Sequence, residues 1–152
     1  MHRLARLSLR EYAVLAGTVT LLIALRFSLW LLPWHRAVTA IGFLSRMIPS
    51  TRLSAERLER LVYRASAIVP CTTCLPRALA LHLLLSASGH ATTFQIGVAR
   101  DLQRGFIAHA WVERDGVPLF SSAGEVARYG RILTIEGPMR DRLMATRLDL
   151  IR

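Results

Sequence analysis

The hydrophobic pattern changes its period near the middle of the chain. Up to Gly89, apolar residues recur at helical spacing or form long apolar runs, and from His90 onward they alternate with polar residues. A period of about 3.6 residues is typical of helices and a period of two is typical of strands. Helices followed by strands predict an α+β fold with an antiparallel sheet.

The first predicted helix runs from Ser8 to Trp34 and is apolar on nearly all sides. Ser8 and Glu11 have the spacing of a capping box, and Pro33 ends the helix because proline lacks a backbone donor. The length of residues 9–34 suits a membrane span, but Arg26 in a bilayer costs roughly 2.5–3.5 kcal/mol. Burial in the protein, docking to a partner and contact with a membrane all stay open.

Two more helices precede the strands. Within the second segment, Ala37–Val69, Ser54 is the expected N-cap. The apolar face that follows consists of Leu58, Leu61, Val62, Ala65 and Ile68. The third helix begins at Thr72 or Thr73 and ends at Gly89. Its residues are apolar on most faces, so we expect it to be central in the fold.

The second half of the chain predicts a small sheet. Asp115-Gly116 is a signal for a two-residue hairpin turn. The four expected strands lie around Phe94–Val98, at Phe106–Arg114, at Val117–Ser121 and at Tyr129–Ile135. A short basic helix is expected from Asp141 to Arg152.

Composition narrows the class of protein only a little. Hydrophobic residues make up 53% of the 152 residues, and the net charge of +10 comes from arginine without any lysine. A basic surface attracts nucleic acid, anionic lipid or acidic peptide. No zinc-finger spacing or aromatic-interleaved basic motif favours nucleic acid, so none is predicted. Two cysteines are too few for a disulfide scaffold, and no signal peptide is visible, so we expect a cytoplasmic protein.

The two cysteines, Cys71 and Cys74, lie three positions apart. A redox pair of this spacing should follow a strand, whereas a helix precedes it here. A zinc site would need a second pair of ligands, which the sequence lacks. We therefore interpret Cys74 as a nucleophile and Cys71 as a bystander, because Cys74 lies at a helix N-terminus, where the helix dipole stabilises an anion.

A cysteine nucleophile needs a histidine partner. His82 lies about two turns along the same helix, roughly 12 Å away, which is too far. His109 lies on a strand of the sheet against which the Cys74 helix should pack, and it shares a face with Trp111 and Glu113. We therefore predict that His109 is the base.

Three stretches carry a resemblance to a known family: "TCLPRALALHLLLSASG", "FQIGVARD" and "AHAWVERDGVPLF". Together they resemble the B proteins of lasso-peptide biosynthesis, over about residues 54–135. These are transglutaminase-like cysteine peptidases that remove the leader from a ribosomally made precursor. The resemblance implies a papain-like core in residues 51–152 and a hydrophobic helical segment in residues 1–50, in the stand-alone peptidase form.

The resemblance assigns Cys74 as nucleophile and His109 as general base. The family pattern expects an acid on the next strand, but the residues opposite His109 are Ser121 or Ser122. Ser121 is our candidate for the orienting residue, since a hydroxyl accepts from an imidazole more weakly than a carboxylate does. Asp115 lies at the hairpin tip, and Glu125 follows in a loop that would have to fold back.

The resemblance also implies partners. These are the precursor peptide, a leader-recognition protein and an asparagine-synthetase-like cyclase that uses ATP, whereas this chain itself would bind no cofactor or metal. The backbone N–H of Cys74 is a candidate oxyanion donor, and Gln95 is a second one that is more simply a strand residue. Membrane contact through the first helix would make the protein membrane-associated. The alternative function is a non-catalytic scaffold that binds a membrane or the biosynthetic partners.

Overall fold

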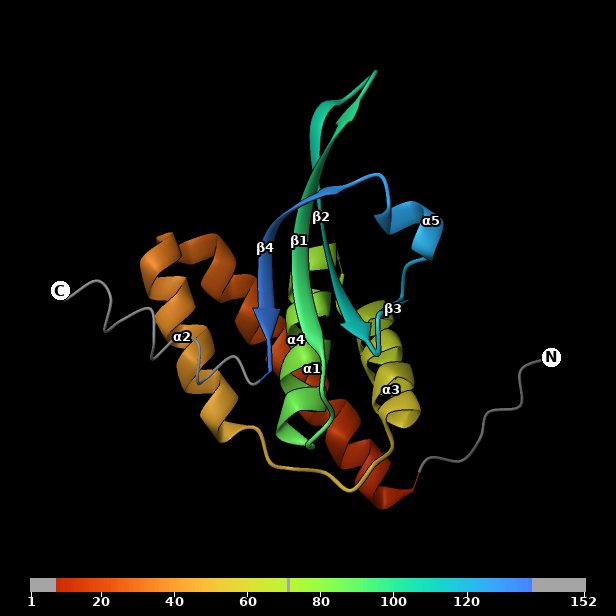
Figure 1. The fold of residues 1–152 in the computed structure, drawn as a ribbon. Helices are drawn as coiled ribbons and strands as arrows, with labels where there is room; N and C mark the ends of the chain where they lie inside the picture. Colours follow the sequence, from red (N-terminus) through yellow and green to blue (C-terminus); the bar gives the residue numbers. More distant parts are fainter. Residues whose placement is uncertain (1–7, 71, 138–152) are drawn as a thin grey trace, which may run out of the picture.

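The computed structural model describes residues 8–70 and 72–137, and it places the long helices on one side of a four-stranded sheet (Figure 1). The helices are α1 (Leu9–Leu31), α2 (Trp34–Met47), α3 (Ala55–Ile68), α4 (Cys74–Ala87) and the short α5 (Ala123–Val126). The strands are β1 (Thr93–Asp101), β2 (Gly105–Arg114), β3 (Val117–Leu119) and β4 (Gly130–Glu136). The predicted α+β class is confirmed, while the helix expected at Asp141–Arg152 lies outside the described residues.

The sheet has the order β3-β2-β1-β4, and all neighbouring strands are antiparallel. Asp115 and Gly116 both have positive φ, at 53° and 76°, as a two-residue hairpin turn requires. β3 ends at Leu119, two residues earlier than predicted, because Phe120 has a φ of 62° and leaves the extended conformation. The β1–β2 hairpin extends well beyond the helices (Figure 1).

Local signals set the start of α1 and the end of α4 as predicted, whereas α2 and α5 were not predicted from the sequence. At α1, the Glu11 backbone N–H donates to Ser8 Oγ over 3.3 Å, and the Ser8 backbone N–H donates to Glu11 Oε2 over 2.8 Å. α4 ends in a left-handed Gly89, with φ of 82°. The backbone N–H groups of Gly89 and His90 donate to the last turn of the helix, which satisfies carbonyls that the helix leaves free.

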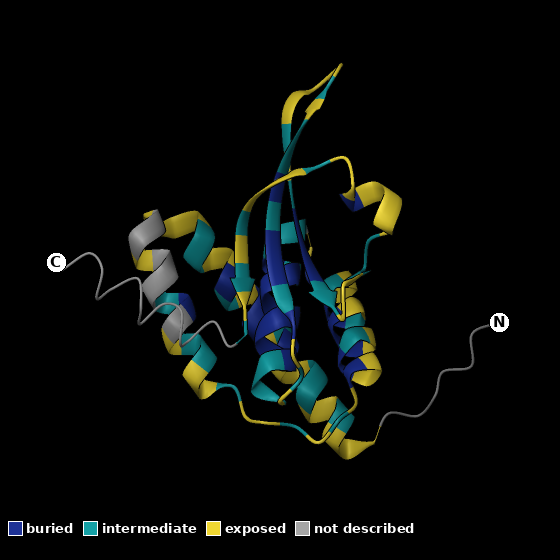
Figure 2. Ribbon diagram, in the orientation of Figure 1, coloured by how far each residue is buried: buried dark blue, intermediate teal, exposed yellow. Residues whose placement is uncertain are grey.

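The core lies between α1, α3, α4 and the inner face of the sheet (Figure 2). α4 is central as expected, since nine of its fourteen residues are buried. On α3 the predicted apolar face is correct except for Ile68, which is 58% exposed; Val69, one residue later, is buried instead. Residues of α1 join the same buried cluster as residues of the 51–152 region, so the boundary at residue 50 stays a prediction.

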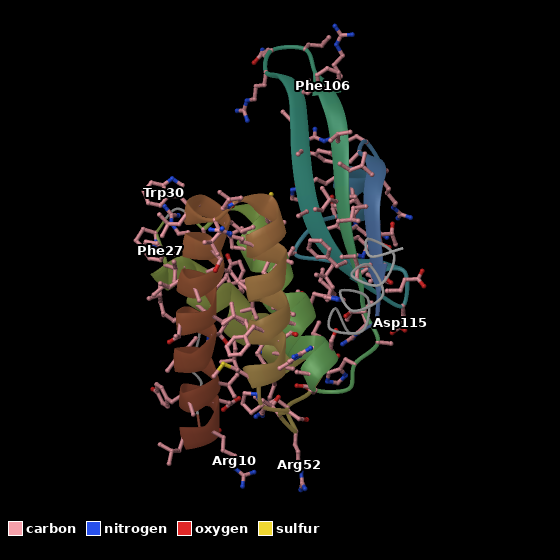
Figure 3. The ribbon with its side chains drawn as sticks, turned by 90° about the vertical axis from the view of Figure 1, so that its left-hand side faces the viewer. Arg10, Phe27, Trp30, Arg52, Phe106 and Asp115 are labelled. Carbon is pink, nitrogen blue, oxygen red and sulfur yellow. The ribbon has the colours of Figure 1, made fainter. Side chains whose placement is uncertain are left out.

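α1 has two different sides. Leu21, Leu22 and Leu25 are buried against the rest of the protein, whereas Phe27 and Trp30 are exposed near its C-terminal end (Figure 3). Among the described residues, α1 is the one helix long and apolar enough to cross a membrane, with a mean hydropathy of 1.9. Core helices of soluble proteins can be equally long and apolar. In α1, one side is buried within the protein, and the other side is left uncovered.

Candidate active site

Cys74 is the first residue of α4 and carries a free, half-buried thiol. Thr73 occupies the N-cap position, but its side chain makes no capping hydrogen bond. The first backbone N–H groups of a helix have no partner within the helix, so the thiol lies where an anion is stabilised. Cys71 lies outside the described residues, so its interpretation as a bystander stays a prediction.

Cys74 opens onto a narrow pocket of about 10 Å³ between α4, β2 and β3, which is on the order of one water molecule. Its lining residues are Cys74, Arg77, Ala78, Leu81, Ala110, Trp111, Val112, Leu119, Phe120 and Ser121. The pocket therefore joins the predicted nucleophile to Ser121, the predicted orienting residue.

Ser121 in turn contacts His109. Ser121 Oγ lies 3.0 Å from His109 Nε2, which leaves the second ring nitrogen, Nδ1, for other partners. Among the described residues, no hydrogen bond joins the Cys74 thiol to the His109 ring. Catalytic hydrogen bonds often tighten only when substrate is bound, so the pairing of Cys74 with His109 stays a prediction.

The His109 side chain lies on the face of β2 that points away from α4. Ala110 and Val112 point into the core beside α4. His109 stacks on Trp111, with ring centroids 6.0 Å apart, and both lie on the opposite face of the strand. The sequence places His109 on this strand, and the structure shows that its ring contacts Ser121, which lines the Cys74 pocket, although His109 itself does not line it.

Two aromatic rings hold the imidazole on this outer face. The ring centroids of Tyr129 and His109 are 5.3 Å apart, and the Tyr129 ring also packs on Trp111. The rings can approach the sheet because Gly97 lies beneath them. A Cβ at Gly97 would stand 2.8 Å from Tyr129 Cβ and 3.0 Å from Trp111 Cη2.

The surroundings keep the His109 ring neutral. Burial lowers the pKa of His109, because a charged ring is poorly solvated there. The Glu125 carboxylate opposes this shift, whereas the guanidinium groups of Arg77 and Arg128 lower the pKa further. The net effect favours an unprotonated imidazole, which is the form that accepts a proton.

The other predicted candidates have structural partners. Gln95 is buried in β1, accepts from Thr134 Oγ1 over 2.6 Å and does not line the pocket. Glu113 accepts from Trp111 Nε1 and from Arg131, not from His109. Ser122 caps α5 by accepting from the Glu125 backbone N–H. Glu125 thus sits in a helix rather than a loop, and its charge reaches His109.

The contacts of three residues near the site were not predicted from the sequence. Tyr129 packs on His109, Phe120 adopts a left-handed backbone conformation directly before Ser121, and Arg77 lies 5.5 Å above the Phe120 ring. Their contacts depend on how distant segments pack. The single usable signal was Gly97, because a glycine within a strand often marks close approach by another part of the chain.

Comparison with known proteins identifies a family to which the sequence is similar. The profile described as the transglutaminase-like superfamily matches residues 19–134, which span α1 to β4 and include Cys74, His109 and Ser121. Comparisons with curated proteins and with solved structures gave no significant match. The match covers most of the chain and agrees with helices followed by an antiparallel sheet. The chain therefore belongs to the transglutaminase-like superfamily.

Proposed function

We propose that this chain is a cysteine peptidase that removes the leader from a lasso-peptide precursor. Proteins of the superfamily are typically cysteine peptidases or transferases. The observation that carries the proposal is the Ser121–His109 hydrogen bond beside the pocket that opens at the Cys74 thiol. The resemblance of the motifs around Cys74 and His109 to lasso-peptide B proteins supports the narrower substrate.

The first half of the reaction forms an acyl-enzyme. His109 Nδ1 accepts the thiol proton, and the Cys74 sulfur attacks the carbonyl carbon at the leader–core junction. The backbone N–H of Cys74 stabilises the oxyanion of the tetrahedral intermediate. The C–N bond then breaks, the imidazolium gives its proton to the departing amine, and the leader stays bound as a thioester.

The second half of the reaction hydrolyses the acyl-enzyme and regenerates the free enzyme. The neutral His109 takes a proton from water, and the hydroxide that forms attacks the thioester carbonyl. The C–S bond breaks, and the thiolate regains the proton from the imidazolium. The products are a leader with a free carboxylate and a core peptide with a new amino terminus, which an asparagine-synthetase-like cyclase would close with ATP.

Ser121 in place of an acid, and the absence of a hydrogen bond between Cys74 and His109 among the described residues, also fit the second candidate, a scaffold without catalysis. A hydroxyl orients an imidazole but does not stabilise its charged form as a carboxylate does. Under the scaffold hypothesis, the chain would bind its biosynthetic partners or a membrane through the exposed side of α1. The two hypotheses differ in one property, the reactivity of Cys74.

The net charge of +10 supports an acidic leader or an acidic recognition protein as partner. The exposed apolar side of α1 supports a docking role for that helix, either against such a partner or against a membrane. Cytoplasmic location, with membrane association as the alternative, remains part of the proposal.

The test is cleavage of a precursor peptide encoded beside this gene, in the presence of its leader-recognition protein, followed by mass spectrometry of the products. We expect a free leader and a free core with wild-type protein and with the matched variant Cys71→Ser. Cys74→Ala should leave the precursor intact. Cleavage that persists in Cys74→Ala would overturn the proposal.

A further inference from the structure

The outer half of the β1–β2 hairpin is a ribbon of two strands with open edges. Within the described residues, β3 pairs only with Val112–Arg114 of β2, and β4 pairs with β1 only as far as Val98. The hairpin nevertheless continues to Asp101 and Gly105. An isolated pair of strands is marginally stable, and an unpaired edge is a template for another strand.

The register shows which backbone groups face the open edge of β2. Arg114 and Val117 flank the two-residue turn, so they form a hydrogen-bonded pair. Hydrogen-bonded and non-bonded pairs alternate along an antiparallel ladder. The N–H and C=O groups of Ala108 and Phe106 therefore point away from β1, into the space beyond the end of β3, and no described strand pairs with them.

This edge lacks the usual protection. Natural sheets cover their edges with proline, lysine, bulges or a packed segment. Phe106 is 83% exposed, Ala108 is exposed with a side chain too small to cover its backbone, and neither is charged. Figure 3 shows Phe106 near the far end of the hairpin, away from the helices.

The open edge leads directly to the candidate active site. Strands rise about 3.3 Å per residue, so Phe106 lies roughly 10 Å along the strand from His109. Ala110, the next residue of the same orientation, lines the pocket that contains Cys74 and Ser121. A chain that pairs with Ala108 and Phe106 thus enters the pocket within two or three residues.

We propose that the open edge of β2 at Phe106–Ala108 binds the substrate as an added strand and delivers its scissile carbonyl to Cys74. The inference rests on the proposed peptidase function and specifies its substrate as a peptide segment in extended conformation. Recognition through the main chain imposes little sequence preference. The exposed Arg100 and Arg104 near the hairpin tip add a preference for acidic side chains.

The test uses alkylating peptides in a Cys71→Ser background. The probe is the peptide Val-Glu-Val-Glu with an electrophile at its amino end (iodoacetyl) or at its carboxyl end (chloromethyl ketone). Each probe is compared with an analogue whose backbone nitrogens are methylated, because this analogue cannot pair as a strand. Iodoacetamide, which has no peptide chain to pair, reports the reactivity of Cys74 itself.

We expect at least one probe to modify Cys74 on the order of tenfold faster than its methylated analogue, as intramolecular delivery raises the local concentration. Ala108→Pro removes the outward N–H, and proline is tolerated on strand edges, so this variant should lose the advantage but keep the iodoacetamide rate. Ala108→Ser keeps the N–H and should keep the advantage.

The possible failures are distinct. A slow iodoacetamide reaction in the parent protein would contradict the proposed function. A fast iodoacetamide reaction with equal rates for both forms of each probe would overturn strand addition alone. A dimer that Ala108→Pro abolishes, together with equal probe rates, would assign the edge to a second copy of the chain and would also overturn the proposal.

Discussion

At the scale of single residues, Ser121 holds the position from which a carboxylate is expected to orient the His109 ring. Its hydroxyl lies 3.0 Å from Nε2, so orientation is retained. The positive charge of a protonated ring is not stabilised, because burial and two guanidinium groups lower the pKa of His109. The protein therefore favours a neutral imidazole at rest, which is the form that accepts a proton from the Cys74 thiol.

Restoring the acid should reverse this preference. In Ser121→Asp, a carboxylate beside the ring raises the pKa of His109 and makes the ring a stronger base toward the Cys74 thiol. We expect the rate of Cys74 alkylation at about pH 6.5 to rise roughly tenfold, as one pKa unit would give. Ser121→Ala should lower the rate. Identical rates in all three proteins would show that residue 121 does not act on His109.

Gly97 is the second residue with a specific consequence. In Gly97→Ala, the new Cβ would collide with Tyr129 and Trp111, and overpacking typically costs about 1–3 kcal/mol. The matched control is Gly130→Ala, whose Cβ would meet only Val98 O at an ordinary 3.6 Å. Urea denaturation should show a lower free energy of unfolding for Gly97→Ala alone. Equal stability of the two variants would contradict the described packing.

At the scale of elements, local signals were sufficient for most helix and strand positions. Ser8, Pro33, Gly89 and the Asp115-Gly116 pair act through backbone conformation and nearby hydrogen bonds, and these depend on adjacent residues alone. The early end of β3 and the exposure of Ile68 depend on tertiary packing. For the same reason, the sequence identified Cys74, His109 and Ser121 as candidates but did not reveal the packing of Tyr129 on His109.

Two glycine substitutions should have opposite effects on helix stability. Gly17 lies within α1 with open space around its Cα, so Gly17→Ala should stabilise the protein by about 0.5–1 kcal/mol. Gly89 has a φ of 82°, and Gly89→Ala should destabilise it by about 1 kcal/mol. Thermal unfolding of both variants provides the measurement. Effects of the same sign would contradict one of the two helix assignments.

At the scale of the whole molecule, His82 makes stability depend on pH. It is fully buried on α4, with Nδ1 3.0 Å from Thr92 Oγ1, and burial lowers its pKa from 6.5 to about 4. Below about pH 6.5 the unfolded chain binds a proton that the folded chain excludes until about pH 4. The free energy of unfolding therefore falls as the pH is lowered through this window.

The expected loss from His82 is about 3 kcal/mol between pH 6.5 and pH 4, at about 1.4 kcal/mol for each pKa unit. Urea denaturation at several pH values measures it. His82→Gln should show a shallower decline, and the difference between the two proteins removes the contribution of the carboxylates. Parallel curves would mean that His82 does not titrate across folding.

The proposed peptidase function depends on activation of the Cys74 thiol by His109. The most direct measurement is the rate at which iodoacetamide modifies each cysteine at about pH 7, determined by peptide mapping of wild type and His109→Gln, since only an activated thiol is largely ionised there. We expect Cys74 to react at least roughly tenfold faster than Cys71 in wild type, and we expect His109→Gln to remove most of this difference. Equal, slow rates for both cysteines in wild type, or a fast Cys74 that is indifferent to His109→Gln, would contradict it.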